Sequence, residues 1–196
     1  DFRRIHTTRS GLVPTFTVVL ALALSVSGLP AQDARENLEP AVEAFFAAAR
    51  SGKLEAVSRA AAPLQEHPEA AAELVASGLA ERSPAEIVLG LRALKVLGCP
   101  GDDGTTISGF LGHSNAEVRT EAVVVAGKVL GDSIVPRIVE ATRDEAENVR
   151  RRAFDALLEL EPRSPAVVKA ALEGVFDSDW WVSGTCLRIL HAQNDA

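Results

Sequence analysis

A short phrase recurs in this sequence at nearly constant intervals. Glu117-Val118-Arg119-Thr120-Glu121-Ala122 returns as Asn148-Val149-Arg150-Arg151-Arg152-Ala153, and the anchor valine returns once more at Val182. The three valines follow one another at intervals of roughly 30 residues, and Lys95-Val96-Leu97-Gly98 recurs at a similar interval as Lys128-Val129-Leu130-Gly131. Such a period is typical of stacked supersecondary units, each too thin to bury its own apolar face. The repeat constrains the architecture far more than the activity.

Helical signals dominate the chain from Asn37 onward. Alanine is abundant, runs of β-branched residues are short, and Gly or Pro interrupts the pattern at short intervals. The predicted helices span 38–50, 53–62, 68–80, 84–97, 104–111, 115–130, 133–142, 146–160, 165–175 and 179–192. We expect an all-α fold, an α-solenoid made of about four to five antiparallel helix hairpins in a right-handed stack.

Apolar residues within these helices follow a helical spacing, which predicts the buried faces. Three stripes belong to the first helices of successive units: Val118, Ala122, Val125 and Val129; Val149, Ala153, Ala156 and Leu160; Val182, Cys186 and Ile189. Two further stripes belong to the companion helices: Ile134, Val135, Ile138 and Val139; Val167, Val168, Ala171 and Leu172. The small residues in second position would let neighbouring helices approach closely.

Residues 1–31 have the pattern of a targeting segment. Arg3, Arg4 and Arg9 precede an apolar stretch from Leu12 to Val26, and small residues up to Ala31 suit cleavage by signal peptidase. The stretch is shorter than the roughly 20 apolar residues of a membrane-spanning helix. We therefore predict export to the periplasm or the extracellular space. The alternative is an uncleaved N-terminal anchor, which would be the only membrane contact.

The rest of the chain is expected to form one domain. Residues 32–37 are interpreted as a polar leader and 38–196 as the helical repeat domain, with the best-defined repeats in 84–192. The formal charge is −7 and no basic stripe is present, so a nucleic-acid partner is not expected. Cys99 and Cys186 lie three units apart, which at about 10 Å per packed helix layer is too far for a disulfide. We expect two free, mostly buried thiols.

No recognisable motif for catalysis or ligand binding emerges from the sequence. No serine lies in a Gly-x-Ser-x-Gly elbow, and His67, His113 and His191 are far apart without ligands at metal-binding spacing. Asp102 and Asp103 lack the alternating oxygen ligands of a calcium loop and are interpreted as a turn with a helix cap. We expect a non-catalytic protein without cofactor or metal.

The units beginning at residues 113 and 144 resemble HEAT-type repeats, in particular the short bacterial variety that also occurs in phycobilisome lyases. The shared pattern is a polar turn, Val-Arg, a small residue, a Leu-Gly ending and a second helix that begins near Asp. The first unit matches it with Val118-Arg119, Ala122 and Leu130-Gly131-Asp132, and the second with Asp144, Val149-Arg150 and Ala153. A third unit keeps Asp177 and Val182 but has Ser183 in place of the arginine.

This resemblance implies a solenoid whose common use is to bind other proteins. It also implies that Arg119 and Arg150 reach acidic residues in the turns and tie one unit to the next, with Asp144 a plausible partner for either. The alternatives are that both arginines are simply solvated or that they bind a ligand.

Two groups of residues are candidates for contact with a protein partner. Trp180 and Trp181 either anchor a partner, or one ring closes the end of the core while the other lies on the surface. The polar stripe of the second helices either is solvated or forms a recognition face; it consists of Arg137, Glu140, Lys169 and Glu173.

We therefore predict an exported scaffold that binds an unidentified protein. Two alternatives remain at this point. One is an accessory, lyase-like HEAT protein that holds a prosthetic group, and the other is a fragment of a larger multidomain enzyme.

Overall fold

The computed structural model describes residues 31–98, 104–160 and 164–194, and all regular secondary structure in these ranges is helical. The α-helices are α1 (Ala31–Arg50), α2 (Leu54–Glu66), α3 (Pro68–Gly78), α4 (Pro84–Leu97), α5 (Thr105–Phe110), α6 (Ala116–Val129), α7 (Val135–Ala141), α8 (Glu147–Leu160), α9 (Pro165–Gly174) and α10 (Trp180–Asn194). Two short 3-10 helices, η1 (Leu79–Glu81) and η2 (Gly131–Ile134), precede α4 and α7. The predicted all-α class is confirmed. Most of the proposed targeting segment, Cys99 and the Asp102-Asp103 pair lie outside the described residues.

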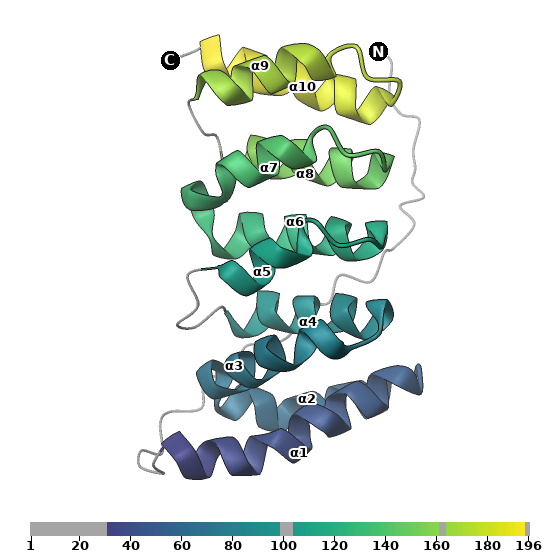
Figure 1. Ribbon diagram of the computed structural model, residues 1–196, viewed down its shortest axis with the longest axis vertical. Helices are drawn as coiled ribbons and strands as arrows, with labels where there is room; N and C mark the ends of the chain where they lie inside the picture. The colour runs from purple at the N-terminus through teal and green to yellow at the C-terminus, as the bar shows by residue number, and fades with distance from the viewer. Residues whose placement is uncertain (1–30, 99–103, 161–163, 195–196) are drawn as a thin grey trace, which may run out of the picture.

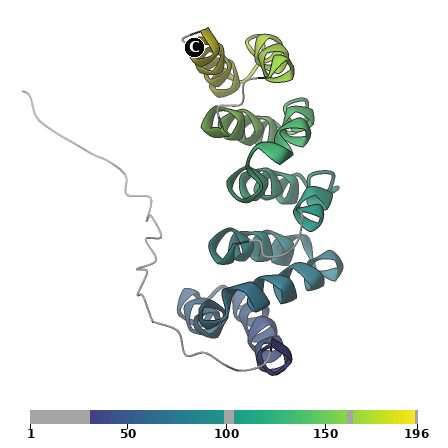
Figure 2. The same ribbon diagram turned by 90° about the vertical axis from the view of Figure 1, so that its left-hand side faces the viewer.

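The helices lie in layers along the long axis of the molecule (Figure 1). Viewed from the side, α4, α6, α8 and α10 form one column, and α5, α7 and α9 lie beside them in another (Figure 2). The contacts follow the same order, because α6 packs on both α4 and α8, α8 packs on α10, and α7 packs on α9. The column of α4, α6, α8 and α10 bends so that both of its ends lie toward the same side, which makes this face concave (Figure 2).

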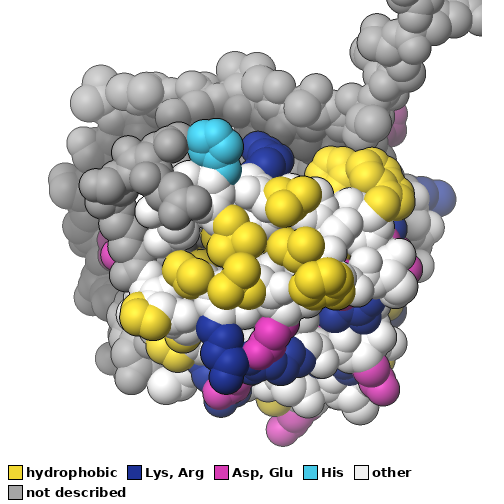
Figure 3. Space-filling model, turned by 90° about the horizontal axis from the view of Figure 1, so that it is seen from above, with side chains coloured by type: hydrophobic (Ala, Val, Ile, Leu, Met, Phe, Trp, Pro, Cys, Tyr) yellow, Lys and Arg dark blue, Asp and Glu magenta, His cyan; other side chains and the backbone are white. Residues whose placement is uncertain are grey.

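The interior lies between the layers. The anchor valines Val118, Val149 and Val182 are each 0% exposed, and Ala122, Ala153 and Cys186 at the second position of each stripe are equally buried. The predicted buried face of the first helices is therefore confirmed along most of its length. The companion stripe of α9 differs, because Leu172 is 55% exposed at the α9–α10 end of the molecule, which Figure 3 views from above.

Local sequence signals explain several helix starts. The side chain of Asn115 accepts hydrogen bonds from the backbone N–H groups of Glu117 (2.8 Å) and Val118 (3.3 Å), which satisfies two of the free donors of α6. Ser164 accepts from the Ala166 N–H (3.2 Å), and Pro165 takes the first helical position of α9, where its missing N–H costs nothing.

Several helix boundaries differ from the prediction. The helix expected over 53–62 continues to Glu66, with Pro63 inside it, and the helix expected over 68–80 ends at Gly78. The first helix begins at Ala31, so residues 32–37, expected as a polar leader, belong to α1. These residues include Gln, Ala, Arg and Glu, which favour helix even without an apolar stripe. The helix expected over 133–142 is instead η2 followed by α7, because Pro136 has a preset φ and no N–H and is therefore accommodated in the first turn of an α-helix.

Candidate functional site

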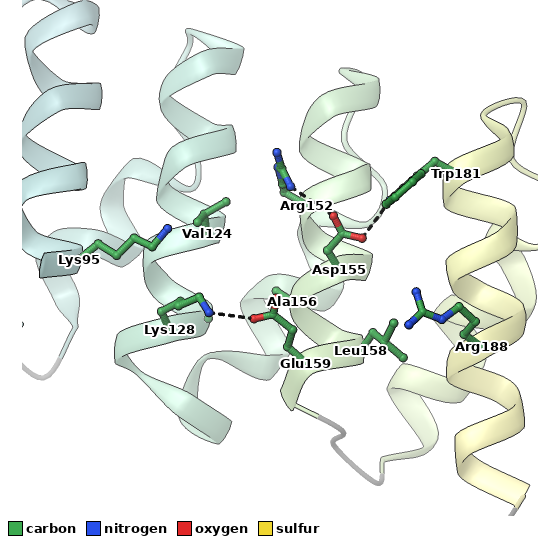
Figure 4. A pocket seen from close by; sticks show the side chains of 11 residues that line it. Lys95, Val124, Lys128, Arg152, Asp155, Ala156, Leu158, Glu159, Trp181 and Arg188 are labelled. Atoms are coloured by element: carbon green, nitrogen blue, oxygen red, sulfur yellow. Dashed lines mark hydrogen bonds and ion pairs between the residues drawn. The ribbon is translucent and has the colours of Figure 1, made fainter. Parts of the chain in front are cut away.

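A hollow of about 420 Å³ crosses the concave face formed by α4, α6, α8 and α10 (Figure 4). Lys95 enters it from α4 and Lys128 from α6, whereas Trp181 and Arg188 enter it from α10. Helix α8 contributes Arg152, Asp155 and Glu159 to its middle. Because these side chains come from successive layers, only the stacking of the helices assembles the hollow.

The repeat explains why two lysines line the same hollow. Lys95 and Lys128 each begin the recurring phrase Lys-Val-Leu-Gly, so they occupy the same position on successive helices. Asp155 and Arg188 are as far apart in the sequence as Lys95 and Lys128 are. They lie on α8 and α10, which are neighbours in the same column of helices. Equivalent positions in stacked repeats lie above one another, and one face of the stack therefore collects them.

The charges in the hollow are not balanced. Lys128 Nζ lies 3.3 Å from Glu159 Oε2, and Arg152 Nη1 lies 3.4 Å from Asp155 Oδ2. Lys95 and Arg188, in contrast, make no hydrogen bond or ion pair within the described part of the chain. The hollow thus has an excess of two positive charges in a chain whose overall formal charge is −7.

Trp181 borders the hollow, and it and the neighbouring Trp180 are both exposed. Trp181 is 41% exposed and donates a hydrogen bond from Nε1 to Asp155 Oδ1 (3.0 Å), and Trp180 is 74% exposed. Their rings pack edge to face with centroids 5.5 Å apart. The expectation that one ring closes the core is wrong. Val182 takes the buried position, and residues one or two places earlier on a helix point to other sides.

The polar stripe predicted as a possible recognition face lies elsewhere, on α7 and α9. Arg137 and Glu140 are exposed and pair with each other (Nε–Oε2 3.7 Å). Glu173 pairs with Arg143 (Oε2–Nη2 2.9 Å), and exposed Lys169 lies one helical turn before it. None of the four residues of this stripe reaches the hollow on the concave face.

The arginines of the repeat phrase contact turn acids, as the resemblance implies. Arg119 Nε and Nη2 each lie 2.8 Å from an oxygen of Asp144, and Arg150 makes the same paired contact with Asp177 at 2.8 and 3.0 Å. Burial acts to raise the pKa of Asp144, but hydrogen bonds from Arg119 and from the Ala146 N–H outweigh it and hold this pKa below its usual value. These arginines are occupied and largely buried, so they are not open to a ligand.

The other reactive groups of the described residues offer little chemistry. Burial, with a smaller effect from Asp177, raises the pKa of the Cys186 thiol to about 12, so its nucleophilic thiolate is scarce near neutral pH. Within the described ranges, no group of three His, Cys, Asp or Glu side chains is placed to hold a metal ion. No helix there combines the length and the apolar character needed to cross a bilayer.

Comparison with known proteins gives no further guide to the site. No family model matches the chain, and no curated protein matches it.

Sequence reasoning singled out Trp181 but missed Lys95, Lys128 and Arg188. The recurrence of Lys95 as Lys128 was a usable signal for one shared face. The absence of ion-pair partners for Lys95 and Arg188 among the described residues depends on side-chain positions and had no signal in the sequence.

Proposed function

We propose that this protein is an exported, non-catalytic scaffold that binds a partner protein along the concave face of α4, α6, α8 and α10. The bound element would be an acidic segment of the partner. The observation that carries this proposal is the pair of cations without ion-pair partners in the described chain, Lys95 and Arg188, at opposite ends of one hollow in a net acidic protein.

We further propose that the architecture is an α-solenoid of HEAT-like hairpins. Its support is the layered order of the contacts and the repetition of the paired contact of Arg119 with Asp144 by Arg150 with Asp177. A stack of this kind presents a pre-formed extended surface. Binding to such a surface orders few groups of the scaffold, which lowers the entropic cost of association.

The chemistry of the hollow favours anionic groups, such as the carboxylates of a protein partner. Acidic residues of a bound segment would face the Lys95 ammonium group at one end and the Arg188 guanidinium group at the other. Neither group has a competing partner among the described residues, and the guanidinium can hold a carboxylate through two hydrogen bonds. Trp181 adds an exposed apolar surface of the kind that dominates binding energy at interfaces. We therefore expect a segment that combines acidic and apolar residues.

Export is part of this proposal and is supported by the pattern of residues 1–31. Expression of the whole chain in a bacterium, followed by mass spectrometry of the periplasmic and culture fractions, tests it. An exported product that begins near Gln32 would support cleavage. Retention of the whole chain in the cytosol would contradict it.

Binding can be measured with a short fluorescein-labelled peptide of alternating Glu and Leu, by fluorescence anisotropy. The double variant Lys95→Glu/Arg188→Glu should weaken binding by at least about tenfold, and added salt should weaken binding to the parent protein. The matched control Arg137→Glu/Arg143→Glu makes the same change of charge away from the hollow and should leave the affinity nearly unchanged. No binding, or equal loss in both double variants, would contradict the proposal. A purified protein that absorbs above about 300 nm would instead favour a bound prosthetic group.

A further inference from the structure

The outer face of the last layer is apolar, as the view along the stack shows (Figure 3). We call it the end face and define it by Val168, Leu172 and Phe176 from α9 and the turn after it, with Leu187 and Leu190 from α10. Leu172 is 55% exposed, Phe176 is 89% exposed and Leu187 is 57% exposed. They account for half of the large hydrophobic residues that are exposed in the described part of the chain.

The α10 residues of the end face occupy positions that are buried one repeat earlier. Leu187 and Leu190 correspond to Phe154 and Leu157 of α8, and each of the latter is 1% exposed. Phe154 is covered by the next layer, since its ring lies directly against Gly174 of α9. The sequence therefore places core-type residues on α10 at positions where a further layer would cover them.

The α9 residues repeat this relationship. Val168 and Leu172 correspond to Val135 and Val139 of α7, which are 7% and 8% exposed. Phe176 corresponds to Arg143, whose guanidinium reaches forward to Glu173 in the following layer. Position 176 thus also points in the direction of a further layer.

We propose that the end face is covered by the end face of a second copy of this chain. A two-fold axis across the helices would place α9 antiparallel to α9 of the partner. This inference does not depend on the proposed acidic ligand, because the end face and the hollow on the concave face share no residue.

The end face has the features that self-complementary pairing needs. An open hollow of about 500 Å³ runs along α9 from Ser164 to Leu172. Pro165, Val168 and Lys169 also line it, together with Gln193 of α10. Phe176 lies just beyond the other end of α9 and projects freely. In the antiparallel arrangement each copy would insert Phe176 into the other's hollow, so the same knob-and-hollow contact forms twice.

The charges at the edge of α9 fit the same arrangement. Lys169 and Glu173 are one helical turn apart. Lys169 has no ion-pair partner among the described residues, and the half-exposed Glu173 pairs with Arg143 of its own chain. Reversal of the second helix places the Lys169 ammonium group of one copy beside the Glu173 carboxylate of the other, and again twice. Two opposite charges on each copy would therefore favour the antiparallel pairing over the parallel one.

The apolar area available is modest. The exposed parts of Leu172, Phe176 and Leu187 with their neighbours amount to roughly 400 Å² per copy, compared with about 800 Å² per partner in a standard stable interface. The edge of α9 adds polar area. We therefore expect a reversible dimer with a Kd on the order of 10 µM.

Sedimentation velocity of the whole chain from about 1 to 200 µM tests the proposal over the range around this Kd. We expect the parent protein to pass from monomer to dimer as its concentration rises. Phe176→Glu and Leu187→Glu should remain monomeric, whereas Val96→Glu, which charges a 63% exposed valine on α4, should dimerise like the parent. A monomer at every concentration overturns the proposal. So does association that persists in Phe176→Glu and Leu187→Glu, because another surface, such as the apolar segment 12–26, would then be responsible.

A charge exchange tests the antiparallel geometry. Lys169→Glu should weaken the dimer roughly tenfold, because it places two carboxylates together at each edge. Adding Glu173→Lys to that variant should restore the parent Kd. If the double variant stays as weak as Lys169→Glu alone, the proposed pairing is wrong.

Discussion

Arg119 of α6 and Asp144, in the turn before α8, are joined by two parallel hydrogen bonds, each of 2.8 Å. The third nitrogen of the guanidinium, Nη1, donates to the carbonyl oxygens of His113 (2.8 Å) and Ser114 (3.1 Å) in the turn before its own helix. One side chain thus connects two consecutive turns. Arg150 makes the equivalent set of contacts one repeat later, to Asp177 and to the carbonyls of Asp144 and Glu145.

Loss of the contact between Arg119 and Asp144 should lower the free energy of unfolding. The side chains of Arg119 and Asp144 are only 9% and 13% exposed, so Arg119→Ala would leave a largely buried carboxylate without its partner. We expect a loss of about 3 kcal/mol in the free energy of unfolding, measured by urea denaturation. Arg119→Lys should recover only part of it, because a lysine cannot form the paired contact.

A matched control is Arg137→Ala. Its pair with Glu140 is solvent-exposed at 3.7 Å, and the expected loss is below about 0.5 kcal/mol. Equal effects of the two alanine variants would show that the Arg119 contact contributes no more than a surface pair.

Stability should fall on acidification between about pH 4 and pH 2. A hydrogen bond from Arg151 is the main cause that lowers the pKa of Asp179 to about 2, and Arg150 likewise lowers the pKa of Asp177. Because both values are depressed in the folded state, the stabilisation is fully present above pH 4 and is lost as protons bind. Urea denaturation at a series of pH values measures it.

Asp179→Asn provides the comparison for this pH dependence. The variant should be less stable than the parent near neutral pH and should lose less stability between pH 4 and pH 2. Parallel pH profiles for the two proteins would contradict the assignment to Asp179.

The anchor valines should tolerate no charge. Val149 of α8 is 0% exposed. Val149→Asp would therefore bury an unpaired carboxylate and should lower the free energy of unfolding by several kcal/mol. Val96→Asp makes the same change at a 63% exposed valine and should cost little. Thermal melts of both variants decide the matter, and a Val149→Asp protein that melts with the parent would contradict the layered interior.

Gly174 should be required for its lack of a side chain. A Cβ at this position would lie 2.5 Å from Cys186 Sγ and 2.7 Å from Phe154 Cζ, so Gly174→Ala should destabilise by about 1–3 kcal/mol through overpacking. Gly184, inside α10, has no atom within 4 Å of such a Cβ, and Gly184→Ala should stabilise by roughly 0.5–1 kcal/mol. Differential scanning calorimetry should therefore show shifts of opposite sign.

The Cys186 thiol should be inert in the folded protein. It is 0% exposed and its pKa is raised to about 12, so the thiolate should be scarce at pH 8. In a Cys99→Ser background, reaction with a chromogenic disulfide reagent should be negligible in buffer and complete in denaturant. Rapid reaction without denaturant would show that the space between α9 and α10 opens easily.

Much of the fold could be predicted because the repeat is local and periodic. The recurring valines Val118, Val149 and Val182 carried the register, and the helical spacing of apolar residues identified the buried side of each helix. The contact of Arg119 with Asp144 was expected from the resemblance to HEAT-type repeats, in which the arginine reaches an acid in a turn. The helix boundaries around Pro136 and before residue 38 were predicted less well, because they depend on how the first turn of a helix begins.

The exposure of Trp180 and Trp181 could not be predicted from the sequence. A large aromatic residue in the last unit suggested a plug for the core, yet both rings are exposed and Val182 is buried instead. Whether a side chain is covered depends on what packs against it, which the pattern of one helix does not contain.

The order of residues along the chain alone determined that it would form a series of helices, each with one apolar side. That much depends on backbone hydrogen bonds and on spacing within single helices. The tertiary structure alone decided that Lys95 and Arg188 find no partner among the described residues around one hollow and that Leu172, Phe176 and Leu187 remain uncovered. These properties depend on distances between layers, which arise only when the helices pack.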